Sequence, residues 1–219
     1  SSIDTGGRYA YGNQPLIARW NLARLAETLL PLIDADADRA IALAVAVIDE
    51  FPVRYEQHWL AVMRAKLGLI GQAPEDLALA NDFLALLQAQ QVDFTQAFRR
   101  LADAADSTRP AGAQAMQALF SDPAALDGWL ARWHSRVAAQ ACEPAPRAAA
   151  MRQVNPAYIA RNHKVEEALA AAGEHNDLAP FEALLAVLQR PFEERTEHGS
   201  YAAPAPAAQA ACYKTYCGT

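Results

Sequence analysis

The sequence predicts an all-α protein, and three observations support that fold class. Hydrophobic residues make up 53% of the chain and charged residues 20%, a composition typical of a globular protein. Much of the apolar fraction is alanine, which has the highest helix propensity. Apolar residues recur at spacings of three and four, and no stretch alternates apolar and polar residues between hairpin turns. We therefore expect a multi-helix fold with a coil tail.

The N-terminal third begins with a loop and continues into two helices. Residues 1–14 are rich in glycine and lack helical periodicity, which indicates a loop. Pro15 suits the first position of a helix that runs to about Pro31. Residues 38–51 are apolar on nearly every side, which favours a helix buried among others. The stripe expected to face the core in the first helix is Ala18, Leu22, Leu25, Leu29 and Ile33.

Local signals predict where the later helices begin and end. Gly68 and Gly71 suit the C-terminus of a helix. Asp93 and Gln96 have the spacing of a capping box, and Asp122 stands directly before a proline. Further helices are expected to start at Pro74, Asn155 and Asp177. We expect a helical region over residues 15–190 and, because proline and alanine dominate residues 201–211, an extended tail over 191–219.

Charge and hydropathy argue against two classes of partner. The net charge of -6 and the pI near 5.4 give no electrostatic reason to expect nucleic acid or an anionic membrane surface. The longest purely apolar run, Ala40 to Ile48, is less than half of the roughly 20 residues that a membrane span requires. Cys142, Cys212 and Cys217 are too few for a disulfide scaffold. A cytoplasmic protein is the expectation.

No set of residues forms a recognisable complete active site. Gly6 and Gly7 precede Arg8, and no lysine stands where a phosphate-binding loop requires one, so an ordinary glycine loop is favoured. No two histidines have the i, i+4 spacing of metal ligands on one helical face. Cys212 and Cys217, close to the C-terminus, could pair as a redox switch or remain idle thiols.

Several runs of the sequence resemble the selenoprotein O (YdiU) family. The match is most specific over the run from Asp4 to Pro15 and the run from Trp20 to Ala26. A second block lies between Val154 and Leu169, and the run from Gln189 to Phe192, with Tyr201, fits the tail of the family. Cys217 occupies the place of the family's C-terminal cysteine.

The resemblance implies a kinase-like protein that transfers AMP from ATP to serine, threonine or tyrosine hydroxyls of other proteins, with magnesium. The nucleotide and metal ligands of such a protein lie upstream of Ser1, so no catalytic, cofactor-binding or metal-binding residue is expected here, and the chain alone should be inactive. Because it begins without an initiator methionine, we expect a C-terminal fragment, the helical C-lobe, with the upstream kinase-like portion and protein substrates as its partners. A non-catalytic helical interaction module is the alternative.

The resemblance also implies roles for particular residues. The loop would be an activation-segment-like element, and the helix bearing Trp20 and Asn21 the buried central helix of the lobe. In the family, the terminal cysteine is thought to bond to a cysteine in that segment. Residues 1–14 contain none, so the partner of Cys217 would be either a cysteine upstream of this chain or Cys212, the nearer candidate. The expected positioning residues of the loop are Asp4, Gly7, Arg8, Tyr9, Asn13 and Gln14.

Overall fold

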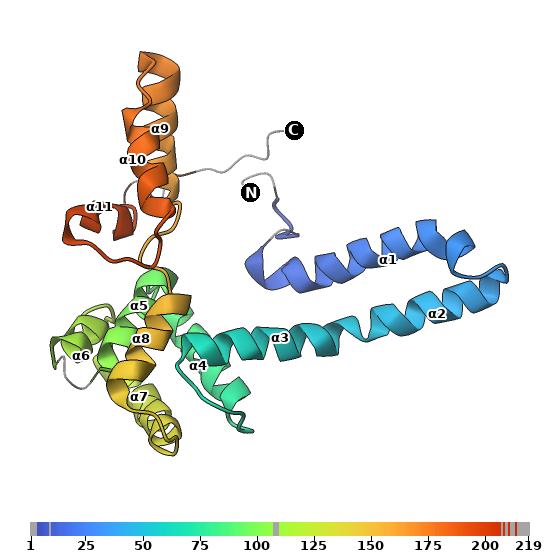
Figure 1. Ribbon diagram of the computed structural model, residues 1–219, viewed down its shortest axis with the longest axis horizontal. Helices are drawn as coiled ribbons and strands as arrows, with labels where there is room; N and C mark the ends of the chain where they lie inside the picture. The colour runs from blue at the N-terminus through green and yellow to red at the C-terminus, as the bar shows by residue number, and fades with distance from the viewer. Residues whose placement is uncertain are drawn as a thin grey trace. The chain divides into compact units, whose positions relative to one another are not determined.

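The computed structural model describes residues 4–8, 10–106 and 110–206, together with Ala208, Ala210 and Tyr213. Every regular element in these residues is a helix, and none is a strand, so the all-α prediction is confirmed for them (Figure 1). The chain divides into two compact units. Unit 1 comprises Ser1–Trp59 and Cys212–Thr219, and unit 2 comprises Leu60–Ala211.

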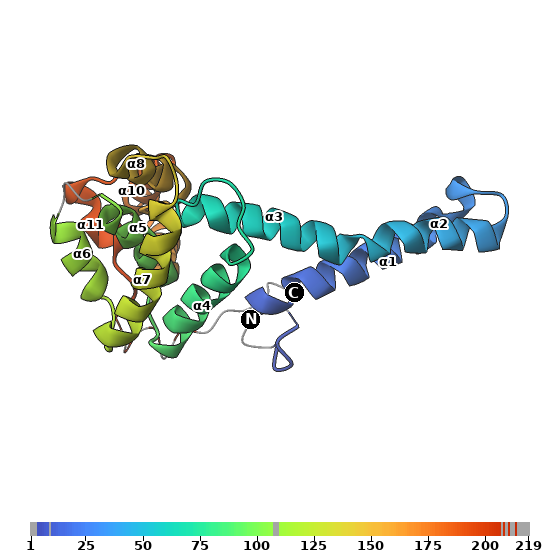
Figure 2. The ribbon, with the colours of Figure 1, turned by 90° about the horizontal axis from the view of Figure 1, so that it is seen from below.

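Unit 1 is built around a helical hairpin. The short 3-10 helix η1 (Tyr11–Asn13) leads into α1 (Gln14–Ile33), and α2 (Ala37–Asp49) runs back beside it (Figures 1 and 2). Asp36 caps α2, because its side chain accepts hydrogen bonds from the backbone N–H groups of Asp38 and Arg39, at 3.0 and 3.3 Å. The chain then enters α3 (Phe51–Lys66), within which the boundary between the units falls.

The hairpin leaves the predicted core stripe open. The side of α1 turned toward α2 carries Ala23, Ala26 and Leu30, whereas the stripe from Leu22 to Ile33 is 39–54% exposed at its large side chains. The expectation that residues 38–51 form a buried helix is likewise wrong for this chain, since Ala40 is the one fully buried residue of α2. The physical reason is that a single pair of helices can bury only one face of each.

Unit 2 packs its helices around an aromatic core. The ring of Phe83 stacks on Trp129, with centroids 4.3 Å apart, and meets Phe98 edge to face at 5.1 Å. The indole N–H groups of Trp129 and Trp133 donate to the carbonyls of Leu79 and Leu67, at 2.9 and 2.8 Å. The helices after α3 are α4 (Asp76–Ala89), α5 (Phe94–Ala104), α6 (Pro110–Gln117), α7 (Pro123–Ala138), α8 (Pro144–Val154), α9 (Asn162–His175), α10 (Ala179–Leu188), η2 (Thr196–His198) and α11 (Gly199–Ala202).

Most of the predicted helix boundaries in unit 2 are confirmed. The side chain of Asp93 accepts from the backbone of Gln96 at 2.9 Å, and that of Asp122 accepts from Ala124 at 3.0 Å. Gly68 follows α3 with φ +67, a conformation that glycine adopts without strain.

Two expectations about unit 2 need correction. No helix starts at Asn155; it follows the end of α8 with extended backbone, as the residue before a proline prefers, and α9 begins at Asn162. The segment expected to be coil after Pro191 contains η2 and α11. In addition, the backbone N–H of Ala210 donates to the carbonyl of Pro206 at 2.9 Å, a helical hydrogen bond.

Candidate functional site

The structure brings four of the expected loop residues together through local hydrogen bonds. The carboxylate of Asp4 accepts from the backbone N–H of Arg8 at 2.9 Å, and its carbonyl accepts from Gly7 at 3.1 Å. Gly7 has φ +65, and its carbonyl accepts from the side-chain amide of Asn13 at 2.8 Å. Asp4 thus binds Gly7 and Arg8, and Asn13, directly before α1, binds Gly7.

Trp20 connects this loop to α1. The guanidinium carbon of Arg8 lies 5.0 Å from the centroid of the Trp20 ring, and that of Arg24 lies 5.7 Å away. Both distances are within the range of cation–π attraction. Arg24 is also paired with Glu27 at 2.5 Å. Trp20 is 49% exposed, so the buried central helix that the resemblance implies is not buried within this chain.

Of the remaining expected site residues, the structure describes only Gln14. Gln14 is the first residue of α1. Tyr9, Cys212 and Cys217 lie outside the described residues, so the loop role of Tyr9 and the redox pairing stay predictions. Among the described residues, Cys142 is a free, partly buried thiol of unit 2.

Asp4 is the one acidic residue among the expected positioning residues of the loop. Within the described part of the chain, no three His, Cys, Asp or Glu side chains stand close enough together to hold a metal ion. Asp4 is a single carboxylate that already accepts the N–H of Arg8. We therefore assign no catalytic step through ATP or magnesium to these residues.

A buried arginine on α5 holds the chain that follows α10. The guanidinium of Arg99 donates to the carboxylate of Glu194 at 2.9 Å and to the carbonyl of Phe192 at 3.3 Å. The same side chain donates to the carbonyls of Arg152 and Asn155, at 3.0 and 3.1 Å. A hydrogen bond from a charged donor is stronger than a neutral one, so Arg99 anchors this segment. Arg100 binds the same Glu194 carboxylate at 2.9 Å.

A second arginine anchors the segment farther along. Arg161 binds the carboxylate of Asp93 at 2.5 Å and the carbonyl of Ala202 at 2.9 Å. Burial by itself would raise the pKa of Asp93, but the hydrogen bonds from Arg161 and the helix cap outweigh it and lower that pKa. Phe192 and Glu194 are therefore bound to α5, and Ala202 is bound to Arg161, the residue before α9. Neither arginine was identified from the sequence, because their partners lie far away in the chain.

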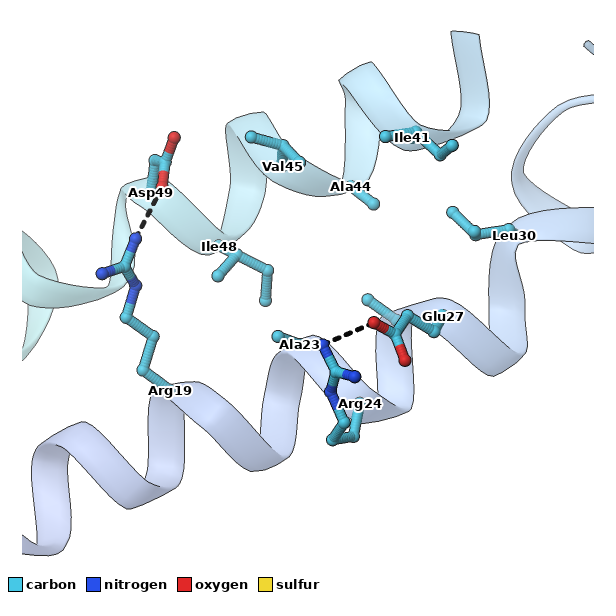
Figure 3. Close-up of a pocket in the computed structure, with 11 residues that line it drawn as sticks. Arg19, Ala23, Arg24, Glu27, Leu30, Ile41, Ala44, Val45, Ile48 and Asp49 are labelled. Atoms are coloured by element: carbon cyan, nitrogen blue, oxygen red, sulfur yellow. Dashed lines mark hydrogen bonds and ion pairs between the residues drawn. The ribbon is translucent and has the colours of Figure 1, made fainter. Parts of the chain in front are cut away.

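A groove of about 540 Å³ lies between α1 and α2 (Figure 3). The ion pair between Arg19 and Asp49, at 2.7 Å, lies at one end, and the pair between Arg24 and Glu27 lies along the α1 edge. Its apolar lining is formed by Ala23, Ala26 and Leu30 from α1 and by Ile41, Ala44, Val45 and Ile48 from α2.

Comparison with known proteins identifies the class to which this helical chain belongs. The family model described as protein adenylyltransferase SelO matches residues 1–189. The chain belongs to the SelO family.

Relatives in the family are similar along the whole chain. A protein nucleotidyltransferase YdiU of Cereibacter sphaeroides is 52% identical over 219 residues, which is all of this chain and 43% of the relative. Proteins of the same name from Rhizobium etli and Rhodopseudomonas palustris are 51% and 48% identical and are covered to 43% and 44%. The chain thus spans less than half the length of these relatives. In the described part of the chain, no helix has the length and apolar character needed to cross a membrane.

Proposed function

We propose that the protein to which this chain belongs transfers AMP from ATP to serine, threonine or tyrosine hydroxyls of other proteins, with magnesium as the metal. The observation that carries the proposal is the family match over residues 1–189. It is supported by relatives named protein nucleotidyltransferase that are about half identical across the whole chain. The partners under this proposal are protein substrates and the upstream kinase-like portion of the same protein.

Within that protein, we propose that the chain is the helical C-terminal lobe and that the nucleotide site lies upstream of it. The loop around Asp4, Gly7 and Arg8 would then be an activation-segment element that positions the substrate or the upstream site. Its hydrogen bonds support this role, since Asp4 and Asn13 make four local bonds with Gly7, Arg8 and Ala10. Tyr9 and Gln14 would act in the same loop.

The decisive experiment uses the longer protein that contains this chain, incubated with a protein substrate and ATP labelled in either the α- or the γ-phosphate. Transfer of the α-label with magnesium is the expected result. Transfer of the γ-label would identify a protein kinase and contradict the proposal. The 219-residue chain alone is expected to transfer neither label, and micromolar binding of magnesium–ATP to it in a titration would contradict an upstream nucleotide site.

A variant of the loop tests the proposed role of the N-terminal residues. Asp4→Asn removes the charge that accepts the Arg8 N–H, and we expect AMP transfer by the longer protein to fall roughly tenfold, which corresponds to about 1.4 kcal/mol. Asp38→Asn is the matched control, because Asp38 is an exposed acid in the first turn of α2. Equal activities for the two variants would remove the positioning role of the loop.

The competing function is a non-catalytic helical interaction module, and the exposed apolar side chains of α1 and α2 favour it. A longer protein that contains a kinase-like lysine and metal-binding aspartate but transfers no AMP would support the module.

For the terminal thiols, we propose a disulfide between Cys212 and Cys217. Its formation lowers the intact mass by about two hydrogens under oxidising conditions, and free thiols in both residues would contradict it.

A further inference from the structure

The hairpin of unit 1 has more apolar surface than its own two helices can cover. Val45 is 51% exposed and Ile41 46%, and both line the groove between α1 and α2. Contiguous exposed apolar side chains of this kind mark surfaces that bind another element. The aromatic core of unit 2 needs no further element to cover it, because Phe83 and Phe98 are already 0–1% exposed. In the described part of unit 1, only Ala40 reaches that degree of burial.

The groove between α1 and α2 has the shape of a binding site for one helix. Three alanines, Ala23, Ala26 and Ala44, line the groove. Larger aliphatic side chains from both helices, among them Leu30 and Ile48, line it as well (Figure 3). Small residues between two helices allow the ridge of a third helix to approach closely. A third helix in this groove would convert the hairpin into a bundle with a central core, the arrangement by which helices bury their apolar stripes.

The charges at the groove define the chemistry of its occupant. Arg19 is paired with Asp49 at 2.7 Å, and Arg24 with Glu27 at 2.5 Å, so these four side chains neutralise one another in pairs. The groove thus presents an apolar floor with balanced charges beside it. Such a surface fits an apolar helical face and gives a charged peptide no net attraction.

Size distinguishes an occupant in the same polypeptide from a separate protein. Stable association of two separate proteins usually buries about 1,200–2,000 Å² of surface. A segment of the same polypeptide needs less, because covalent linkage supplies a high effective concentration. The relatives contain more than half of their length outside the part that this chain matches.

We propose that the groove lined by Ala23, Ala26, Ala44 and Val45 receives an apolar helix from the portion of the SelO-family protein that lies outside these 219 residues. The inference rests on the proposed function in one respect only, that the chain works as part of a longer protein. It goes further by naming the surface through which the two portions join. Unit 1 is this joining surface, and the core of unit 2 is complete without it.

Thiol labelling of the longer protein and of the 219-residue chain tests the proposal. In both, Cys142, Cys212 and Cys217 are replaced by serine, and Val45→Cys introduces one thiol in the groove. Leu178→Cys is the matched control, since Leu178 is 55% exposed and lies in unit 2. We expect maleimide to label Val45→Cys at least about tenfold more slowly in the longer protein than in the 219-residue chain, because labelling then requires local opening. The control should react at similar rates in both.

Three results would overturn the proposal. The first is equal labelling of Val45→Cys in both proteins, and the second is slowing of Leu178→Cys by the same factor, which would mean that the protection is not specific to the groove. The third is protection that grows with protein concentration, which would assign the groove to a second copy. Ile41→Cys repeats the measurement at another lining residue if Val45→Cys does not fold. Labelling uses no nucleotide, so a protected groove in a protein that transfers no AMP would retain this inference and remove the proposed function.

Discussion

Units 1 and 2 are both helical and both rich in apolar residues, yet they bury those residues to different extents. In unit 2, Phe83, Leu101 and Trp133 are 0–1% exposed. In the described part of unit 1, Ala40 is the one residue buried to that degree, while Val47 of the same helix is 70% exposed. An apolar helix becomes core only when a second layer covers it, and the hairpin lacks that layer in this chain.

One ion pair from each unit illustrates the same contrast. Arg19 and Asp49 in unit 1 remain 42% and 60% exposed, whereas the side chain of Asp76 in unit 2 is fully buried between Arg64 and Arg136. An exposed pair contributes little, because water and salt screen it. A buried pair as a whole also adds little to the free energy of unfolding. Removing one partner nevertheless lowers that free energy strongly, because a buried charge is then left unpaired.

The strongest test of the contrast is truncation of an aromatic ring in the core of unit 2. Phe83→Ala removes contacts with Phe98 and Trp129 and should lower the free energy of unfolding of the 219-residue chain by about 4 kcal/mol. Leu25→Ala on α1 is the matched change in unit 1 and should cost less than about 1 kcal/mol, since Leu25 is 54% exposed. Urea denaturation followed by circular dichroism measures both; similar losses would mean that the units do not differ.

Removal of a buried carboxylate should have the next largest effect. Asp76→Ala leaves Arg64 and Arg136, 14% and 9% exposed, without their shared partner, and should cost about 3 kcal/mol. Asp49→Ala removes the exposed partner of Arg19 and should cost about 0.5 kcal/mol or less. Thermal unfolding of both variants checks the pair, and a large loss for Asp49→Ala would show that the groove-end ion pair matters more than its exposure suggests.

The same carboxylate predicts how unit 2 responds to acid. Burial by itself would raise the pKa of Asp76, but hydrogen bonds from Arg136 and Arg64 outweigh burial and lower it. A lowered pKa means that the stabilisation is fully present above the unfolded value of about 3.9 and is lost as the pH falls through the folded value. Asp76→Asn should therefore flatten the loss of stability below about pH 4, measured by tryptophan fluorescence. An unchanged acid slope would contradict the lowered pKa.

Two glycines in helices of unit 2 should respond with opposite signs to replacement by alanine. A Cβ at Gly112 would overlap the carbonyl of Asp103 where α6 crosses α5, so Gly112→Ala should cost about 2 kcal/mol. A Cβ at Gly128, in α7, meets nothing within 4 Å, and Gly128→Ala should stabilise by about 0.5–1 kcal/mol through its higher helix propensity. Chemical denaturation tests both changes, and a loss for Gly128→Ala would indicate packing that the structure does not contain.

The smallest expected effect concerns the rim of the groove in unit 1. Arg24→Gln removes an exposed i, i+3 ion pair with Glu27 and weakens the contact with Trp20, at a cost of about 0.5 kcal/mol. Raising the salt concentration should reduce the difference from the unchanged chain, because salt screens exposed charges. A cost that does not change with salt would mean that the ion pair is not its source.

The features that the sequence predicted correctly depend on short-range interactions. Asp93 caps α5 through a residue three positions away, and Asp122 caps α7 through a residue two positions away. Both patterns are visible in any window of a few residues. The apolar periodicity of α1 could also be recognised in the sequence. Periodicity identifies the apolar face of a helix, but it does not identify the element that covers this face.

The features that the sequence did not predict depend on partners far along the chain. Arg99 binds Glu194 across 95 positions, and Arg161 binds Asp93 across 68. Asn155 was expected to begin a helix, because asparagine before proline is a local start signal, but its side chain is used elsewhere. In the candidate site, the contact between Arg8 and Trp20 depends on the path of the loop, which its glycines leave open.

Asn155 has a consequence for how unit 2 folds. Its side-chain amide donates to the carbonyl of Lys66 at 2.8 Å, 89 positions away, and its own carbonyl accepts from Arg99, 56 positions away. One buried residue thus joins its own segment to two others. If α8 docked one residue out of register, the amide would enter the interior without its acceptor. That cost exceeds the net gain of an ordinary hydrogen bond. Asn155 therefore acts against misfolding, since it penalises shifted registers that apolar packing alone would tolerate.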